Sequence, residues 1–245
     1  MDNISIVIPA RYKSSRFPGK PLAKILGKEM IIRVCDICSK VIKKKNIYVA
    51  TDDNRISNVV KKKGYNFIKT KKECFTGTDR VFHASKKIKS NLIINVQGDE
   101  PIINGADIKK IISAKKKFPH HVICGFNKTT LLEAKNKNIP KVVFNKNFDM
   151  IYMSRAVIPE NKPKNKKNYE IYKQVCIYAF NKKQLGKYGN LRKKSTLEKI
   201  EDIELLRFLD LNIPIKMIKV SNRSIAVDVI SDVKKVESFL KKWRL

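Results

Sequence analysis

The chain has 245 residues, 42% of them hydrophobic, and its 54 Lys and Arg residues against 22 Asp and Glu residues give a formal net charge of +32. This length and apolar content are enough for one compact domain over residues 1–245, while apolar runs no longer than a strand exclude a membrane span. The N-terminus leads into an apolar strand without a basic segment or a cleavage site, which argues against secretion and predicts a soluble, cytoplasmic protein.

The strong positive charge has two interpretations. It is typical of nucleic-acid-binding proteins, but here Lys far outnumbers Arg and is spread over nearly every predicted helix and loop. Aromatic residues do not alternate with the basic residues in a pattern suited to stacking on bases. We therefore favour a generally basic solvated surface, which also attracts small anionic ligands, over a nucleic-acid-binding module. Neither nucleic-acid binding nor membrane insertion is predicted.

Strands and helices alternate through most of the chain, a pattern typical of βαβ units and a mainly parallel sheet. Apolar runs predict strands at residues 4–10, 46–53, 65–70 and 91–96. Helical periodicity predicts helices at residues 30–42, 55–64, 79–89 and 107–117. Ligands of open α/β sheets bind beyond the carboxyl ends of the strands, so we expect the chemistry at the polar residues that follow Pro9, Val49 and Val96.

Further strands, one polar loop and two helices are predicted in the second half of the chain. We expect strands at residues 121–127, 141–145, 148–159, 172–181, 215–220 and 225–229. Residues 160–170 are rich in Lys, Asn and Pro and predict an exposed, mobile loop around residues 162–167. Residues 231–243 predict a helix with Ser231 as its N-cap. Residues 196–212 predict another, with a buried face made of Ile200, Ile203, Leu206 and Leu209.

The five cysteines, an odd number in a chain with no export signal, are expected to be reduced thiols. Cys35 and Cys38 form a CxxC pair. They lie on a predicted helix, however, and neither a second such pair nor a nearby His completes a zinc site. We therefore favour core packing over metal binding for both.

A basic loop that contains glycine follows the first strand. The segment PARYKSSRFPGKPL places Arg11, Lys13, Arg16 and Lys20 around Gly19 and small hydroxyl residues. Backbone N–H groups in such a loop can approach a triphosphate closely, and the cationic side chains can neutralise the charge that moves onto a leaving pyrophosphate. The segment matches neither GxxxxGK[ST] nor GxGxxG, and an ordinary basic loop is the alternative.

Two aspartates stand just beyond apolar runs. Asp99 follows an expected strand within NVQGDEP, and Asp228 stands near the end of the run IAVDV. Carboxylates at strand ends are a common means of holding Mg²⁺ against substrate phosphates, and two of them from different strands can converge on one ion. Taken singly, each aspartate also suits a turn or a helix cap, so both interpretations remain open.

Six segments together resemble one family. PARYKSSRFPGKPL, YVATDD, TGTDR, NVQGDEP, YMSRAVIP and the late VDV occur in the order and approximate spacing of the CMP-KDO synthetases, the 3-deoxy-manno-octulosonate (KDO) cytidylyltransferases. The similarity spans essentially the whole chain. It implies an α/β, Rossmann-like nucleotidyltransferase fold with a mainly parallel mixed sheet and a small dimerisation excursion at roughly residues 148–182. It also implies an enzyme, usually a homodimer, that uses Mg²⁺ to transfer CMP from CTP to KDO, releasing pyrophosphate, for lipopolysaccharide synthesis.

The resemblance also implies roles for individual residues. Lys20, Arg16 and Asp99 correspond to catalytic residues, and Asp99 and Asp228 correspond to magnesium ligands. The residues expected to bind the nucleotide are Arg11, Ser14, Arg16, Lys20, Thr76, Gly77, Thr78, Arg80 and Gln97. Those expected to contact the sugar are Gln174, Tyr178 and Glu204.

Two departures from the family pattern fall on the sugar side. Gln174 stands where the family usually has a His, and Leu205 follows Glu204 where the family often has a Gln. The nucleotide and metal motifs are intact. The sequence therefore keeps two alternatives open for the acceptor besides KDO, namely 8-amino-KDO and a nonulosonic acid.

Overall fold

The computed structural model describes residues 3–14, 16–161, 169–221 and 224–243. By its internal contacts the chain divides into two compact units, residues 1–109 with 223–245 (unit 1) and residues 110–222 (unit 2), and helix α4 (Gly105–Lys117) spans the boundary in sequence. The loop predicted around residues 162–167 lies outside the described residues. A single domain over residues 1–245 with an excursion near 148–182 stays a prediction.

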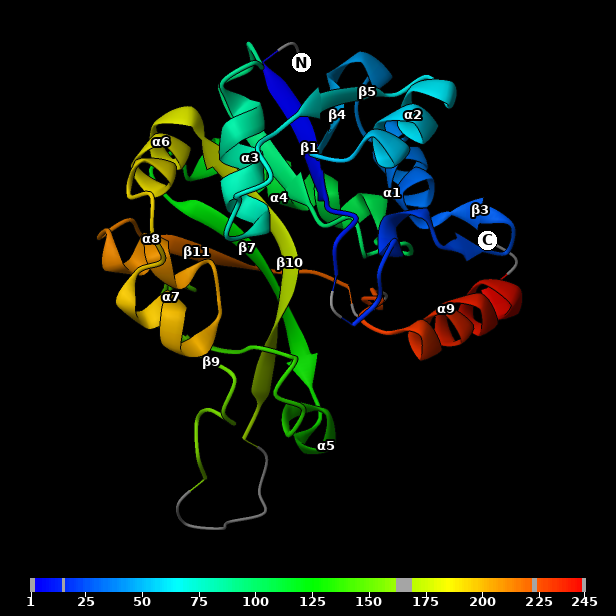
Figure 1. The fold of residues 1–245 in the computed structure, drawn as a ribbon. Coiled ribbons are helices and arrows are strands. Elements are labelled where there is room, and N and C mark those ends of the chain that lie inside the picture. Colours follow the sequence, from blue (N-terminus) through cyan, green and yellow to red (C-terminus); the bar gives the residue numbers. More distant parts are fainter. Residues whose placement is uncertain (1–2, 15, 162–168, 222–223, 244–245) are drawn as a thin grey trace. The chain divides into compact units, whose positions relative to one another are not determined.

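Unit 1 contains a parallel sheet in the order β6-β1-β4-β5 (Figure 1). Its strands are β1 (Ile4–Ala10), β4 (Ile47–Thr51), β5 (Asn66–Lys69) and β6 (Leu92–Val96). All seven residues of β1 are buried, as a continuous apolar run in a covered parallel sheet requires. The strands predicted in this half of the chain, and their parallel arrangement, are therefore confirmed.

A helix follows each of the first three of these strands along the chain. These helices are α1 (Met30–Ser39), α2 (Asn54–Lys62) and α3 (Gly77–Ser85), with single 3₁₀ turns η1 (Lys20–Leu22) and η2 (Lys44–Asn46) and the short hairpin β2 (Lys24–Ile25) and β3 (Lys28–Glu29). Cys35 and Cys38 lie on α1 with no exposed surface, so their predicted packing role is confirmed. Burial raises the pKa of both thiols well above the ordinary value, which keeps them protonated.

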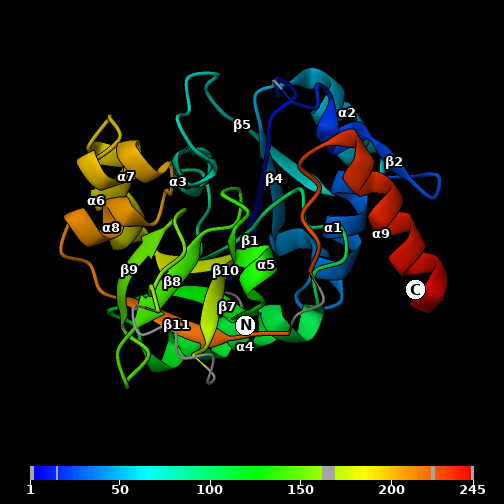
Figure 2. The same ribbon diagram turned by 90° about the horizontal axis from the view of Figure 1, so that it is seen from below.

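The C-terminal helix α9 (Ile230–Trp243) completes unit 1 and lies beside β2 (Figure 2). Its residues Val236 and Leu240 pack in one apolar cluster with Val227, Ile25, Met30 and Ile102. The strand predicted at residues 225–229 is wrong, because Val227 is buried in this cluster and its N–H donates to the Asp99 carbonyl oxygen over 2.9 Å. This segment is apolar because it packs against α9, and not because it pairs in a sheet.

Ser231 lies within the first turn of α9 and is not its N-cap, contrary to the prediction. The Asp232 carboxylate instead accepts hydrogen bonds from the N–H groups of Asp228 over 3.0 Å and Val229 over 3.1 Å. A carboxylate in the first turn of a helix can accept hydrogen bonds from N–H groups at the helix start, as the hydroxyl of a Ser or Thr N-cap does. Asp232 thereby fixes the backbone that carries Asp228.

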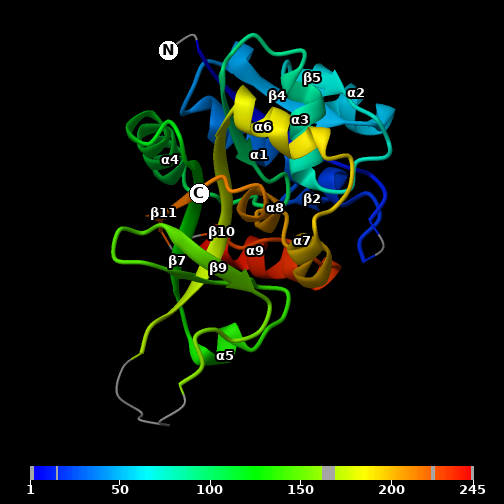
Figure 3. The same ribbon diagram turned by 90° about the vertical axis from the view of Figure 1, so that its left-hand side faces the viewer.

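Unit 2 is built on a long antiparallel pair, β7 (Val122–Thr129) with β10 (Ile171–Asn181), to which β11 (Ile215–Lys219) adds in parallel (Figure 3). The shorter strands β8 (Lys141–Phe144) and β9 (Met150–Ser154) pair with each other, and β8 also pairs with β10. Two helices that were not predicted are α5 (Leu131–Ala134) and α6 (Lys182–Asn190). No helix in the described part of the chain has the length and apolar character needed to cross a membrane.

The helix predicted at residues 196–212 is in fact two short helices, α7 (Thr196–Glu201) and α8 (Leu206–Asp210). Asp202 ends α7 in the left-handed region, with φ of 50°, and this turn changes the direction of the chain. The apolar residues before and after Asp202 consequently do not lie on one helix face. Ile203 and Leu206 are buried as expected, but Ile200 is 74% exposed.

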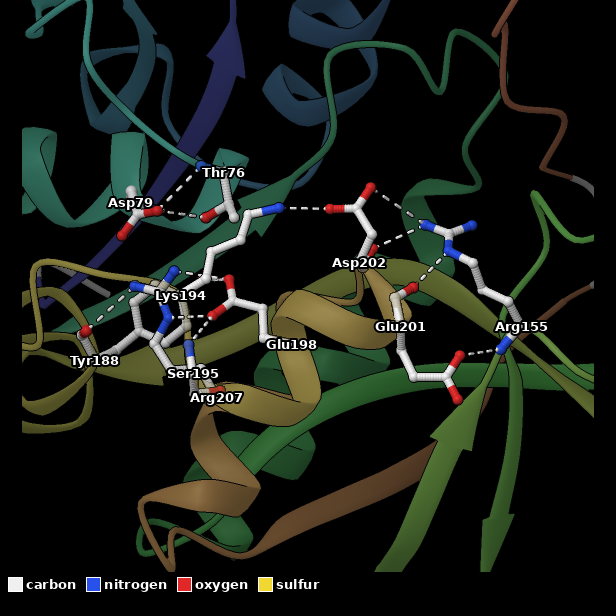
Figure 4. A network of polar contacts seen from close by, with 10 residues as sticks. All are labelled: Thr76, Asp79, Arg155, Tyr188, Lys194, Ser195, Glu198, Glu201, Asp202 and Arg207. Carbon is white, nitrogen blue, oxygen red and sulfur yellow. Dashed lines mark hydrogen bonds and ion pairs between the residues drawn. The ribbon is translucent and has the colours of Figure 1, made fainter.

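The two short helices are joined by a buried ion pair (Figure 4). The Arg207 guanidinium donates two hydrogen bonds to the Glu198 carboxylate, over 2.6 and 2.7 Å, and neither side chain has exposed surface. Glu198 also accepts from the Ser195 N–H over 3.0 Å, and the guanidinium lies 3.8 Å from the centroid of the Tyr188 ring. Each charge is therefore paired and hydrogen-bonded, which buried charges require.

Candidate functional site

The carboxyl ends of β1, β4 and β6 lie at the same edge of the unit 1 sheet, because the three strands are parallel and Ala10 pairs with Thr51. The loop that begins at Arg11 leaves this edge from β1, and the segment from Gln97 to Asp99 leaves it from β6. The polar residues after the strands are thus gathered at one edge, as the sequence predicted.

Small residues allow these segments to touch. A Cβ on Gly98 would lie 2.9 Å from the Pro9 carbonyl oxygen, and a Cβ on Gly77 would lie 3.3 Å from the Gln97 side chain. Gly98 therefore lets the segment after β6 pack against the end of β1 at backbone distance. Gly77 similarly lets the start of α3 approach Gln97. Three of the predicted motifs meet here.

The Lys20 ammonium lies at the centre of this site. It contacts Asp99 Oδ2 at 2.7 Å, the Val227 carbonyl oxygen at 2.9 Å and Asp228 Oδ1 at 3.8 Å. The Lys20 side chain is 16% exposed, so these charges interact more strongly than they would in open water. Arg16, which is exposed, adds a second cation 3.2 Å from Asp228 Oδ1. Two carboxylates distant in the sequence therefore converge on one cation.

This donor set fits a divalent cation. Asp99 and Asp228 offer oxygen ligands, the kind that Mg²⁺ prefers, and the ammonium between them demonstrates that a positive charge can be accommodated at this point. The described residues hold no cluster of three or more His, Cys, Asp and Glu side chains suited to a metal. A two-carboxylate site matches the usual binding of Mg²⁺ by one or two carboxylates together with substrate phosphates and water.

The TGTDR motif forms the start of α3. The Thr76 hydroxyl accepts from the Asp79 N–H over 3.0 Å and the Asp79 carboxylate accepts from the Thr76 N–H over 3.0 Å, which is a capping box. Arg80 is buried and pairs with Asp52 over 3.0 Å, and it also donates to Thr70 and to the Lys71 carbonyl oxygen. In this structure the Arg80 charge is thus already compensated, and its predicted contact with a nucleotide stays a prediction.

The residues predicted to contact a sugar belong to unit 2. The Gln174 amide donates to the Tyr178 hydroxyl oxygen over 2.9 Å, across a register shift in β10 between Val175 and Tyr178. Both side chains are buried, and burial raises the pKa of Tyr178 well above its ordinary value, with the Glu204 charge acting in the same direction. Tyr178 therefore stays a neutral phenol whose oxygen is oriented by Gln174.

The predicted residues thus fall into two groups. Arg16, Lys20, Asp99 and Asp228 are in contact in unit 1, and Gln174 and Tyr178 are in contact in unit 2. Of the other nucleotide-side residues, Arg11 is exposed, while Ser14 and Gln97 are half-buried. The Val227 carbonyl oxygen and the cap from Asp232 were missed. A carbonyl carries no sequence signal, but an Asp four residues after Asp228 at a helix start is a recognisable capping pattern.

We expect Gly98→Ala to destabilise the protein by about 1–3 kcal/mol, because its Cβ would lie 2.9 Å from backbone that cannot move independently of β1. Gly186→Ala is the matched control, since a Cβ on this α6 residue meets no atom within 4 Å and alanine favours the helix by roughly 0.5–1 kcal/mol. Urea unfolding of both variants checks the prediction. Equal or greater stability of Gly98→Ala would show that the close approach is not a constraint.

Comparison with known proteins places this site in a family context. The model of the cytidylyltransferase family matches residues 5–216. The chain is 36% identical to the 8-amino-3,8-dideoxy-manno-octulosonate cytidylyltransferase of Shewanella halifaxensis, over 97% of this chain and 98% of that one. It is also 36% identical to the 3-deoxy-manno-octulosonate cytidylyltransferase of Syntrophotalea carbinolica, over 98% and 99% of the two chains.

Solved structures agree with these relatives. A structure of CMP:2-keto-3-deoxy-manno-octonic acid synthetase complexed with CTP superposes with a TM-score of 0.91 at 34% identity, covering 98% of both chains. The predicted α/β nucleotidyltransferase fold with a mostly parallel mixed sheet is thereby confirmed. The relatives carry two different sugar names at equal identity, so similarity alone does not choose between the two acceptors.

Proposed function

This chain belongs to the cytidylyltransferase family and is a nucleotidyltransferase, and we propose that it transfers CMP from CTP to the anomeric hydroxyl of KDO, giving CMP-KDO and pyrophosphate. The observation that carries the proposal is the Lys20 ammonium held between Asp99 and Asp228, at 2.7 and 3.8 Å, beside the basic loop. This site favours an enzyme over a nucleic-acid-binding module, because the net charge is the one observation that supports nucleic-acid binding.

The reaction is an in-line displacement at the α-phosphorus. The sugar oxygen forms a bond to that phosphorus, the bond to the oxygen that bridges the α- and β-phosphates breaks, pyrophosphate departs, and the hydroxyl proton passes to solvent. The protein has little covalent chemistry to perform in such a transfer. Its contribution is to position the two substrates and to neutralise charge.

The residues of unit 1 divide this work. Lys20 and Arg16 are cations beside the two carboxylates and are suited to stabilising the charge that accumulates on departing pyrophosphate. Asp99 and Asp228 would hold Mg²⁺, which when bound supplies Lewis-acid polarisation of a phosphate oxygen. Gly77, Gln97 and the basic loop, with Arg11, Ser14 and Lys20, would line the nucleotide. Thr76, Thr78 and Arg80 would join them from the start of α3, which the capping box of Thr76 fixes.

The residues of unit 2 set the acceptor. Gln174 is neutral and orients the Tyr178 oxygen, and Glu204 lies close enough to influence the Tyr178 pKa. We assign these three residues to sugar binding. The specific rival to KDO is 8-amino-KDO, because a neutral amide in place of an imidazole leaves no cation to repel an amino sugar. We further propose that the enzyme works as a cytoplasmic homodimer, in line with the family resemblance.

A panel of acceptors tests the proposal. Pyrophosphate release with CTP and Mg²⁺ is measured for KDO, 8-amino-KDO and a nonulosonic acid, and for KDO with the other nucleoside triphosphates. We expect the highest kcat/KM with CTP and KDO. A higher kcat/KM with 8-amino-KDO would move the assignment to that sugar, and turnover with the nonulosonic acid alone would overturn both.

Gln174→His tests the sugar side directly. A protonated imidazole repels an ammonium group, so the variant should lower the ratio of kcat/KM for 8-amino-KDO over KDO, and more strongly below pH 6.5, about the ordinary pKa of His. Gln174→Asn is the control, because it shortens the side chain without adding charge. An unchanged ratio in Gln174→His at every pH would remove Gln174 from the sugar site.

A further inference from the structure

The aromatic ring of Tyr12 has two neighbours within unit 1. The first is Gly19, whose added Cβ would come within 3.1 Å of the ring, and the Gly19 N–H donates to the Tyr12 carbonyl oxygen over 2.9 Å. The second is Arg55, whose guanidinium carbon is 3.3 Å from the ring centroid. Tyr12 thus joins the two ends of the basic loop to each other and joins the loop to α2.

Arg55 is held in place by its own helix cap. Asp53 Oδ1 accepts from the Arg55 N–H over 2.9 Å and from Arg55 Nε over 3.0 Å, and Asp53 Oδ2 accepts from the Arg55 terminal nitrogen over 2.7 Å. These bonds hold the pKa of Asp53 below its ordinary value. The Arg55 side chain is 59% exposed, but its guanidinium makes two hydrogen bonds to one carboxylate while it lies over an aromatic ring, and these contacts restrict its position.

The position of Gly19 matters for the site. Gly19 has φ of 72° and precedes Lys20, whose ammonium is the cation between the two aspartates. A glycine at positive φ gives the chain a conformation that other residues rarely adopt, and the Tyr12 ring occupies the space that a side chain would need. The ring therefore helps to fix the turn from which Lys20 extends.

We propose that Arg55 is a positioning residue which, through its stack on Tyr12, holds the basic loop in the conformation that receives the triphosphate. This inference rests on the proposed function, because the loop is assigned to CTP. Arg55 itself need not touch the nucleotide. Without the stack of Arg55 on Tyr12, the fraction of free enzyme in the receptive conformation would fall. If that fraction falls to a tenth, the apparent affinity for CTP falls about tenfold, while kcat at saturating CTP is unchanged.

The test combines kinetics with tryptic cleavage. For Arg55→Ala we expect KM for CTP to rise about tenfold with kcat changed by less than about threefold. We also expect faster cleavage by trypsin after Arg11, Lys13 and Arg16 without nucleotide, because the loop opens more often. Lys62→Ala, an equal loss of charge at an exposed position of α2, is the control and should behave as wild type.

Further variants separate the stack from charge. Tyr12→Phe keeps the ring and should resemble wild type, whereas Tyr12→Leu should resemble Arg55→Ala, and the double variant of Tyr12→Leu with Arg55→Ala should be no worse than either. Arg55→Lys keeps a cation for the ring and should recover part of the affinity. A fall in kcat at unchanged KM, or wild-type cleavage in Arg55→Ala, would overturn the proposal.

The outcomes also distinguish this proposal from the proposed function. Cleavage of the loop is measured without nucleotide, so it reports on the stack of Arg55 on Tyr12 even if CTP is not the substrate. Absence of CTP turnover in the wild-type enzyme would overturn the proposed function, and the cleavage rates of the Arg55 and Tyr12 variants would still decide whether the stack holds the loop.

Discussion

Replacing Asp99 or Asp228 by Asn should lower kcat by at least about 100-fold, the order of loss seen when one electrostatic stabiliser is removed from an active site. The expectation follows from the convergence of both carboxylates on the Lys20 ammonium, at 2.7 and 3.8 Å. Each substitution keeps the size of the side chain and removes its charge. It also removes one of the oxygen ligands assigned to Mg²⁺, so the Mg²⁺ concentration needed for half-maximal turnover should rise.

The two aspartates should act as one unit. We therefore expect the double variant to lose little more activity than the worse single variant, because the remaining carboxylate alone no longer completes the site. Pyrophosphate release at saturating CTP and sugar, over a range of Mg²⁺ concentrations, measures the effect. Chelation of divalent cations should abolish turnover of the wild-type enzyme. Addition of excess Mg²⁺ should restore it.

A matched control lies in the same unit. Asp36 pairs with Lys28 over 2.7 Å, the same distance that separates Lys20 and Asp99, but it belongs to α1 and to none of the nucleotide motifs. Asp36→Asn should leave kcat close to wild type. If Asp99→Asn and Asp228→Asn also retained near-normal turnover in Mg²⁺, the assignment of the metal ligands and the proposed chemistry would both be wrong.

The second large effect concerns stability. Arg207→Met or Glu198→Gln should destabilise the protein by roughly 3–5 kcal/mol, because each leaves one group of a fully buried ion pair without its partner. The loss reflects an uncompensated buried charge or donor more than the net value of the pair. Substituting both partners should consequently cost less than the sum of the single substitutions.

Urea unfolding followed by far-ultraviolet circular dichroism measures these changes. The control is Lys194→Met, which removes a partner of the exposed Asp202 carboxylate in the same region (Figure 4) and should cost no more than about 1 kcal/mol. Because the internal contacts divide the chain into two compact units, the transitions are compared at more than one wavelength before a single free energy is assigned. Additive losses in the double variant would contradict the coupling of Glu198 and Arg207.

Local pattern explains where sequence analysis succeeded. The strands of unit 1 are continuous apolar runs that end in polar residues, and parallel βαβ connection requires their carboxyl ends to meet at one edge. Asp99 at the end of such a run could therefore be recognised before its partners were known. The motif order also identified the family, since PARYKSSRFPGKPL and NVQGDEP combine charge, glycine and proline in a specific arrangement.

Local pattern also explains the errors. Residues 225–229 have the composition of a strand, yet Val227 is buried against α9 and its N–H serves Asp99. Residues 196–212 have helical spacing, yet the left-handed Asp202 divides them and exposes Ile200. In both segments the hydrophobic periodicity predicted some of the buried residues correctly. Burial does not specify, however, which groups pair with the backbone N–H and C=O groups of a segment.

The amino-acid sequence by itself determined the parallel βαβ half, the family and the residue types of the site, because these depend on short-range periodicity and on motifs read in chain order. Only the tertiary structure decided which charges are neighbours. Lys20 meets Asp99 and Asp228 across 79 and more than 200 residues of sequence, and Arg55 on α2 reaches Tyr12 in the loop after β1. Such contacts are set by how the elements pack, and a charge in isolation does not indicate whether it will bind a ligand, fix a loop or, like Arg207, be buried in the core.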